Sequence, residues 1–247
     1  MTYCLAIKVK EGLVAIADTC ITAGSNTSIK KKVHIEQYEN HSLFIMTSGL
    51  RSVRDKTINY FQELSEVNKN YNKLYKAVNA FGEQLKRVAQ EDKSFLLNAG
   101  LKFNLHTIIG GQLKDDDSQK LFLIYPEGNW VEIEEDSAYL IIGNSNQGKA
   151  ILNRLIDSNT SMKQALKAGI LSFDSTRASA NNVDFPIDVV LYKKNSFKML
   201  ERRYEQKDLA EITDLWTQKL KKSLDELPEN WIDSTFNTHE EKLKITK

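Results

Sequence analysis

The amino terminus of this 247-residue chain holds the residues whose chemistry is easiest to recognise. The sequence begins Met1-Thr2-Tyr3-Cys4, and a small second residue such as threonine permits removal of Met1. Thr2 would then carry a β-hydroxyl beside a free α-amine, whose ordinary pKa is about 8. At neutral pH such an amine is within reach of its neutral form, so it can accept the proton of its own hydroxyl. Thr2 is therefore a candidate nucleophile that carries its own base.

A hairpin at the start of the chain brings an aspartate toward Thr2. Residues 3–9 and 13–17 are β-prone runs separated by Lys10-Glu11-Gly12, which is the pattern of two strands and a short turn. Cross-strand partners in such a hairpin have indices that sum to roughly 21–23. Asp18 should then lie within a few residues of Thr2.

A second hairpin should present a lysine and a glycine at the end of its strands. Residues 33–38 alternate in polarity, residues 39–41 form a turn, and residues 43–46 return. Here cross-strand indices sum to roughly 80, which places Lys32 opposite Thr47-Ser48-Gly49. We expect the ends of both hairpins to converge on Thr2 at one sheet edge.

Charge assigns a role to each of these residues. A partly buried Lys32 ammonium would lower the pKa of the Thr2 hydroxyl, and Asp18 would keep that lysine charged and oriented. The backbone N–H of Gly49 would hold the oxyanion of a tetrahedral intermediate, which is worth a few kcal/mol of barrier. The alternatives remain open: Asp18 as a turn residue, Lys32 as a surface charge and Gly49 as a helix entry.

Residues 141–150, IIGNSNQGKA, nearly match a phosphate-binding loop. That motif needs a final Ser or Thr to ligate magnesium, and a strand–loop–helix unit of a parallel sheet around it. The sequence has Ala150 at the last position, and the preceding segments are typical of an antiparallel meander. We therefore expect Gly143 to end a strand, residues 144–146 to cap a helix and Gly148 to permit close packing.

Composition excludes several classes of protein. A formal charge of +1 predicts neither a nucleic acid nor an anionic membrane as partner, and no apolar run reaches the roughly 18 residues of a membrane-spanning helix. The start of the chain lacks the pattern of a signal peptide, and two cysteines fit a reducing cytoplasm. The four histidines show no spacing typical of a metal site, so we expect no metal and no cofactor.

The order of elements indicates an α+β fold. Four strands, two helices, four strands, two helices, two strands and one helix follow one another, and strands joined by short turns are antiparallel. Paired helices favour a four-layer αββα sandwich of two antiparallel sheets. We expect a single domain over residues 1–228 and a polar tail over residues 229–247. After the first four strands, helices are predicted near 50–64, 74–88, 151–156, 162–173 (N-cap Ser161) and 208–227, and strands near 103–113, 121–125, 130–133, 139–142, 186–192 and 197–204.

The motifs at these positions resemble the β-subunits of proteasomes and their bacterial relatives. The threonine start without a propeptide resembles most closely the bacterial Anbu group of proteasome-like proteins. This resemblance spans residues 2 to about 205. Its motifs are Thr2, Asp18, Lys32-Val33 and Thr47-Ser48-Gly49, with Met1-Thr2-Tyr3-Cys4, Ala17-Asp18, Ala23-Gly24, Ser172-Phe173-Asp174-Ser175-Thr176 and Phe185-Pro186-Ile187-Asp188.

The resemblance implies an N-terminal-nucleophile hydrolase that acts on peptide bonds. It implies Thr2 as nucleophile and base, Asp18 and Lys32 as the pair that tunes it, and Gly49 as the oxyanion donor. The family also uses a serine and an Asp–Ser pair to orient the terminal amine. Asp174 matches the aspartate and Ser145 the first serine, while Arg177 stands where the second serine is expected and leaves Ser179 as a candidate. Lys31 is the alternative to Lys32.

The resemblance also implies partners. It predicts a peptide or unfolded-protein substrate, self-association into a ring, barrel or helical stack, and a separate ATP-dependent activator. An alternative function keeps the fold with weak or no proteolysis, as an assembly scaffold or as an amidase or amide-forming enzyme that uses the same nucleophile.

Overall fold

The computed structural model describes residues 2–23, 26–67, 71–134, 138–157, 159–233 and 236. The chain divides into two compact units, Met1–Gln206 and Lys207–Lys247. Helix α5 (Gln206–Asp225) supplies most of the described part of the second unit. Met1 and most of the tail expected over residues 229–247 lie outside the described residues. No helix within the described ranges is both long and apolar enough to cross a bilayer.

The first sheet contains the chain's amino-terminal strand in its interior. Its order is β10-β1-β2-β11-β12, and every neighbouring pair is antiparallel. All residues of β1 and β2 are buried except Lys8, because the sheet is covered on both faces. Its strands are β1 (Tyr3–Val9), β2 (Gly12–Asp18), β10 (Tyr139–Gly143), β11 (Ile187–Lys193) and β12 (Met199–Tyr204).

The second sheet is a five-stranded antiparallel meander in chain order. It faces the first sheet through a core that includes Cys4, Ala15, Phe44 and Met46. Its strands are β5 (Val33–Tyr38), β6 (His41–Gly49), β7 (Leu105–Leu113), β8 (Lys120–Ile124) and β9 (Trp130–Glu132).

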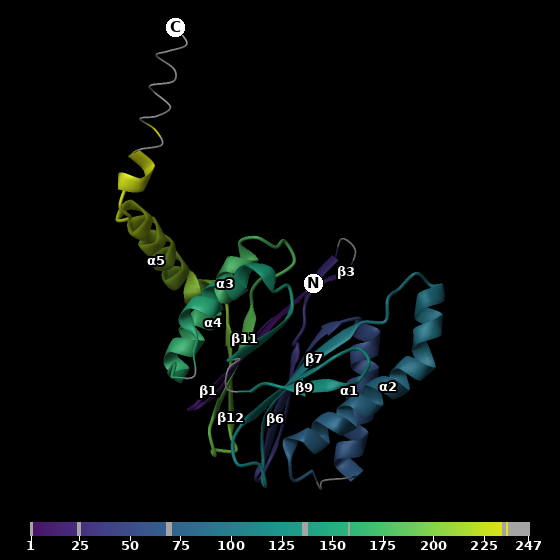
Figure 1. The fold of residues 1–247 in the computed structure, drawn as a ribbon. Helices are drawn as coiled ribbons and strands as arrows, with labels where there is room; N and C mark the ends of the chain where they lie inside the picture. The colour runs from purple at the N-terminus through teal and green to yellow at the C-terminus, as the bar shows by residue number, and fades with distance from the viewer. Residues whose placement is uncertain are drawn as a thin grey trace. The chain divides into compact units, whose positions relative to one another are not determined.

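One pair of helices covers the outer face of each sheet (Figure 1). Helices α1 (Arg51–Val67) and α2 (Leu74–Asn98) pack on the second sheet, where buried residues of α2 recur every three or four positions. Helices α3 (Asn146–Leu155) and α4 (Met162–Arg177) cover the first sheet. The predicted four-layer αββα sandwich is confirmed within the first unit.

The predicted hairpin pairings are confirmed, and one hairpin was missed. Cys4 pairs with Ala17 and Val33 with Met46, which are the registers that the turns predict. A further hairpin consists of β3 (Cys20–Ala23) and β4 (Asn26–Ile29), so the described residues before the first helix form six strands instead of four. Its sequence, Cys-Ile-Thr-Ala followed by Asn-Thr-Ser-Ile, lacks a continuous apolar alternation, so periodicity did not reveal it.

The loop that resembles a phosphate site has the structural role expected of it. Strand β10 ends at Gly143, whose φ of +88° favours glycine, and it runs antiparallel to β1. Ser145 is the N-cap of α3, although its side chain makes no capping hydrogen bond. A Cβ on Gly148 would lie 2.2 Å from Ser172 Oγ, so this glycine allows α3 to pack closely on α4.

We predict that Gly148→Ala destabilises the fold. Overpacking of this kind costs about 1–3 kcal/mol, and it outweighs the roughly 1 kcal/mol by which alanine favours a helix. A net loss of up to about 2 kcal/mol is expected in urea unfolding. Lys149→Met, at the exposed neighbouring position, should change stability by less than about 0.5 kcal/mol. Saturable ATP binding that Lys149→Met abolishes would contradict the packing role.

Candidate active site

The carboxylate of Asp18 is the centre of the polar cluster at the amino terminus. Asp18 is the last residue of β2 and is fully buried. Its Oδ1 accepts hydrogen bonds from the Tyr3 N–H and from Lys32 Nζ, both at 2.7 Å, and its Oδ2 accepts from the Cys20 N–H at 3.2 Å. Three segments of the chain therefore donate to one carboxylate.

Lys32 reaches Asp18 because the β3–β4 hairpin begins and ends close to Asp18. Lys32 lies just before β5, is only 6% exposed, and also donates to the Cys20 carbonyl at 2.7 Å. The segment that follows the hairpin is bound to the segment that precedes it, because the Thr19 carbonyl accepts a hydrogen bond from the Lys30 N–H at 2.8 Å. Lys31, the alternative lysine, is directed elsewhere: it is exposed and pairs with Glu201.

Burial sets the electrostatics of this cluster. Removal from water raises the pKa of the Asp18 carboxyl, whereas the Lys32 ammonium and the two backbone N–H donors oppose that rise. Burial also raises the pKa of the Cys4 thiol, so this neighbouring cysteine stays protonated and is a poor nucleophile. Thr2, the residue before Tyr3, carries a hydroxyl, which is a weak nucleophile unless an adjacent base activates it.

The main chain of Thr2 is held by the junction between β10 and α3. The Thr2 carbonyl accepts the Asn144 N–H at 2.7 Å. A Cβ on Gly143 would lie 1.8 Å from that carbonyl and 3.2 Å from Ser48 Oγ, so Thr2 and the end of β6 are neighbours. The Cys4 thiol adds a contact of 3.9 Å to the carbonyl of Thr47.

Gly49 ends β6 in a conformation that requires glycine. Its φ is +148°, and a Cβ would lie 2.0 Å from the Asn104 carbonyl. Gly49 is exposed, and the next N–H, that of Leu50, is bound to the same Asn104 carbonyl. The ends of both hairpins thus lie near Thr2. The two hairpins belong to different sheets, so they meet across the sandwich and not at one sheet edge as expected.

Three residues, Ser145, Asp174 and Ser179, are expected to orient the Thr2 amine, and their contacts differ from those of Asp18 and Lys32. Ser145 follows Asn144 directly and is partly buried. Asp174 Oδ1 accepts from Arg177 Nη2 at 3.1 Å, and Ser179 is exposed, with its hydroxyl donating to the Ser175 carbonyl at 3.3 Å. Within the described ranges, neither Asp174 nor Ser179 forms a hydrogen bond with Thr2.

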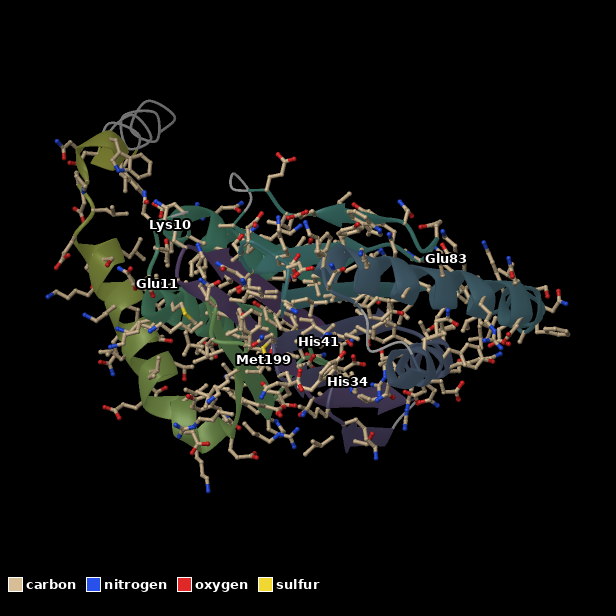
Figure 2. The ribbon with its side chains drawn as sticks, turned by 90° about the horizontal axis from the view of Figure 1, so that it is seen from below. Lys10, Glu11, His34, His41, Glu83 and Met199 are labelled. Carbon is tan, nitrogen blue, oxygen red and sulfur yellow. The ribbon has the colours of Figure 1, made fainter. Side chains whose placement is uncertain are left out.

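Two of the four histidines lie close to Glu36 and not to Asp18. His34 and His41, labelled in Figure 2, approach the two oxygens of Glu36 at 3.6 and 3.9 Å. His41, expected in a turn, is the first residue of β6. In the described part of the chain, no group of three or more His, Cys, Asp or Glu side chains is arranged to hold a metal ion.

Sequence reasoning missed the groups that position Thr2 through the main chain and through Tyr3. Asn144 and Cys20 act by backbone atoms, for which side-chain type gives no signal. The Tyr3 hydroxyl donates to Ser172 Oγ at 2.8 Å across 169 residues of sequence. The continuous apolar run at residues 3–7 is consistent with a buried strand but cannot identify the partner of Tyr3.

We predict that Lys32→Met is strongly destabilising, because it leaves the Asp18 carboxylate buried without its cation. Removing one partner of a buried pair costs about 3–5 kcal/mol, measurable by urea unfolding. Adding Asp18→Asn should recover part of the loss, since no charge then remains buried. Lys31→Met, which removes only the exposed pair with Glu201, should cost less than about 1 kcal/mol. Equal losses for the two lysine variants would contradict this picture.

Comparison with known proteins agrees with this geometry. The family described as proteasome subunit matches residues 2–190. No curated protein sequence matches the chain. An Anbu (Gly-1) mutant from Hyphomicrobium sp. strain MC1 is 30% identical, with a TM-score of 0.85 over 93% of this chain and 99% of that one.

Two other solved structures are similar over nearly the whole chain. Anbu (ancestral beta-subunit) from Yersinia bercovieri is 28% identical, and the structure titled helical assembly of the Anbu complex from Pseudomonas aeruginosa is 27% identical. Each gives a TM-score of 0.85 and covers 92% of this chain and 97% of the other. The chain therefore belongs to the proteasome subunit family, and within it to the Anbu proteins.

Proposed function

We propose that this protein is an N-terminal threonine hydrolase that cleaves peptide bonds after Met1 has been removed. The observation that carries the proposal is the shared Asp18 carboxylate, which binds the Tyr3 N–H and the buried Lys32 ammonium at the same oxygen. This contact brings a fixed positive charge to the residue that follows Thr2. Membership of the proteasome subunit family supports the same reaction class.

The proposed reaction uses Thr2 twice. Its neutral α-amine takes the proton of its own hydroxyl, and the hydroxyl oxygen attacks the peptide carbonyl. The Lys32 ammonium favours the developing alkoxide, while the Gly49 N–H stabilises the oxyanion. Collapse forms an ester on Thr2, and the protonated amine gives its proton to the leaving amine. Water, deprotonated by the same amine, then hydrolyses the ester and restores the hydroxyl.

The partners of this reaction belong to the proposal as well. The substrate would be a peptide or an unfolded chain, supplied in the cytoplasm by a separate ATP-dependent activator. Self-association of this chain is supported by its similarity to the Anbu complex from Pseudomonas aeruginosa, which is described as a helical assembly. Ser145, Asp174 and Ser179 would complete the site by orienting the Thr2 amine, which requires Asp174 to exchange its contact with Arg177.

That last requirement favours a second candidate function. Asp174 is paired with Arg177, and the exposed Ser179 donates to the Ser175 carbonyl, so these two groups are engaged with their own helix and its end in this conformation. A poorly oriented amine would leave the same nucleophile weak. The alternative is therefore an assembly scaffold with little proteolysis, or an amidase or amide-forming enzyme of the same fold.

We predict that Thr2→Ala removes peptide hydrolysis. Loss of the nucleophile should lower turnover of short fluorogenic peptides by roughly 10³-fold or more, because the covalent route is closed. Protein that retains Met1 should be equally inactive, since its Thr2 nitrogen is an amide. Intact-mass measurement assigns the terminus of each preparation, and Lys31→Met serves as the control variant. Equal rates for wild type and Thr2→Ala would exclude the peptidase. Failure of a peptide epoxyketone to label correctly processed wild type would favour the alternative.

A further inference from the structure

Tyr3 is held at both ends, and it is the residue next to the proposed nucleophile. Its N–H donates to Asp18 Oδ1 at 2.7 Å, and its hydroxyl donates to Ser172 Oγ at 2.8 Å. Its side chain is fully buried, with the ring edge-on to Phe173 at a centroid distance of 5.8 Å. From this geometry we infer that Tyr3 is a positioning residue, whose bond to Ser172 fixes Thr2 relative to Lys32. The inference rests on the proposed function.

The acceptor of this hydrogen bond is itself immobilised. Ser172 is fully buried on α4, and its carbonyl accepts the Thr176 hydroxyl at 2.9 Å. Gly148 of α3 packs directly on it, because a Cβ there would lie 2.2 Å from Ser172 Oγ. The absence of a side chain at Gly148 therefore leaves room for Ser172 Oγ in the place where it receives the Tyr3 hydroxyl.

The donor keeps its proton under all working conditions. Burial raises the pKa of the Tyr3 phenol far above its ordinary value, so the hydroxyl is neutral and can donate. Phenylalanine would fill nearly the same volume, and packing against Phe173 alone does not require a hydroxyl. The Tyr3 hydroxyl adds a hydrogen bond that ties the start of β1 to Ser172 Oγ of α4.

Thr2 lies between contacts that come from distant parts of the chain. Its carbonyl is bound by Asn144, and the next side chain is bound by Ser172, both in the second half of the sequence. Asp18 and Lys32, which act on Thr2 in the proposed reaction, come from the first hairpins. The Tyr3–Ser172 bond is thus a direct link between helix α4 and the strand end that carries Thr2. Small displacements of a reacting group can cost about 100-fold in rate.

The test compares Tyr3→Phe, Ser172→Ala and the double variant with Tyr192→Phe. Tyr192 is a matched control, because it is also a buried strand tyrosine and its hydroxyl donates to Gln112 Oε1 at 2.8 Å. Each protein is prepared without Met1, as verified by intact mass. Stability is measured by urea unfolding, and kcat and KM with a fluorogenic peptide.

Tyr3→Phe and Ser172→Ala should each lower kcat by about 10-fold, with KM changed less than about twofold. The double variant should regain stability over the single ones, because no buried hydroxyl lacks a partner, but its kcat should stay low. Tyr192→Phe should lose comparable stability and keep the wild-type kcat. Rates that follow stability across all four variants would overturn the inference.

A second readout separates this inference from the proposed function. The pH midpoint for acylation of the Thr2 α-amine by a small reagent can be followed by mass even in a protein without turnover. A nearby cation lowers an amine pKa, so Tyr3→Phe should move the midpoint toward the ordinary value of about 8, by roughly half a pH unit. A shift without turnover in wild type would retain the positioning role and reject the hydrolase. A midpoint equal to that of Tyr192→Phe would reject the positioning role.

Discussion

A buried carboxylate must be provided with donors, and this requirement organises the amino-terminal end of the molecule. The Asp18 side chain is fully buried, and its donors are the start of β1, the first residue of β3 and the lysine that precedes β5. None of the three donors can be displaced without leaving a buried charge incompletely bonded, which is expensive. The paths of three chain segments are therefore fixed by one side chain, and the place of Thr2 depends on them.

Most of the fold could be predicted from strand register and from the periodicity of apolar residues. The pairs Cys4–Ala17 and Val33–Met46 follow from where the turns lie, since a hairpin leaves little freedom once its loop is set. The predicted N-cap at Ser161 forms a full capping box with Gln164, as its residue types indicate. Local rules of this kind predict contacts between residues that are close in sequence.

Those local rules could not predict contacts between residues that are far apart in the sequence. The choice between Lys31 and Lys32 depends on which side chain turns inward after the unpredicted β3–β4 hairpin, and only Lys32 meets Asp18. The bond from Tyr3 to Ser172 depends on how α4 packs on β1. The expected amine-orienting group was taken from resemblance, and the present contacts of Asp174 and Ser179 are with their own helix and its end. The function of these three residues stays a prediction.

The position of β1 between β10 and β2 has a consequence for biosynthesis. The strand's outer neighbour β10 and the Asn144 partner of Thr2 lie about 140 residues later in the chain, so the ribosome makes them on the order of 10 s after the terminus emerges. During that interval the first residues cannot be enclosed by their final neighbours. An aminopeptidase acting on the nascent chain would find Met1 accessible before the fold closes around residue 2. The removal of Met1 on which the proposed reaction depends would then precede completion of the sheet.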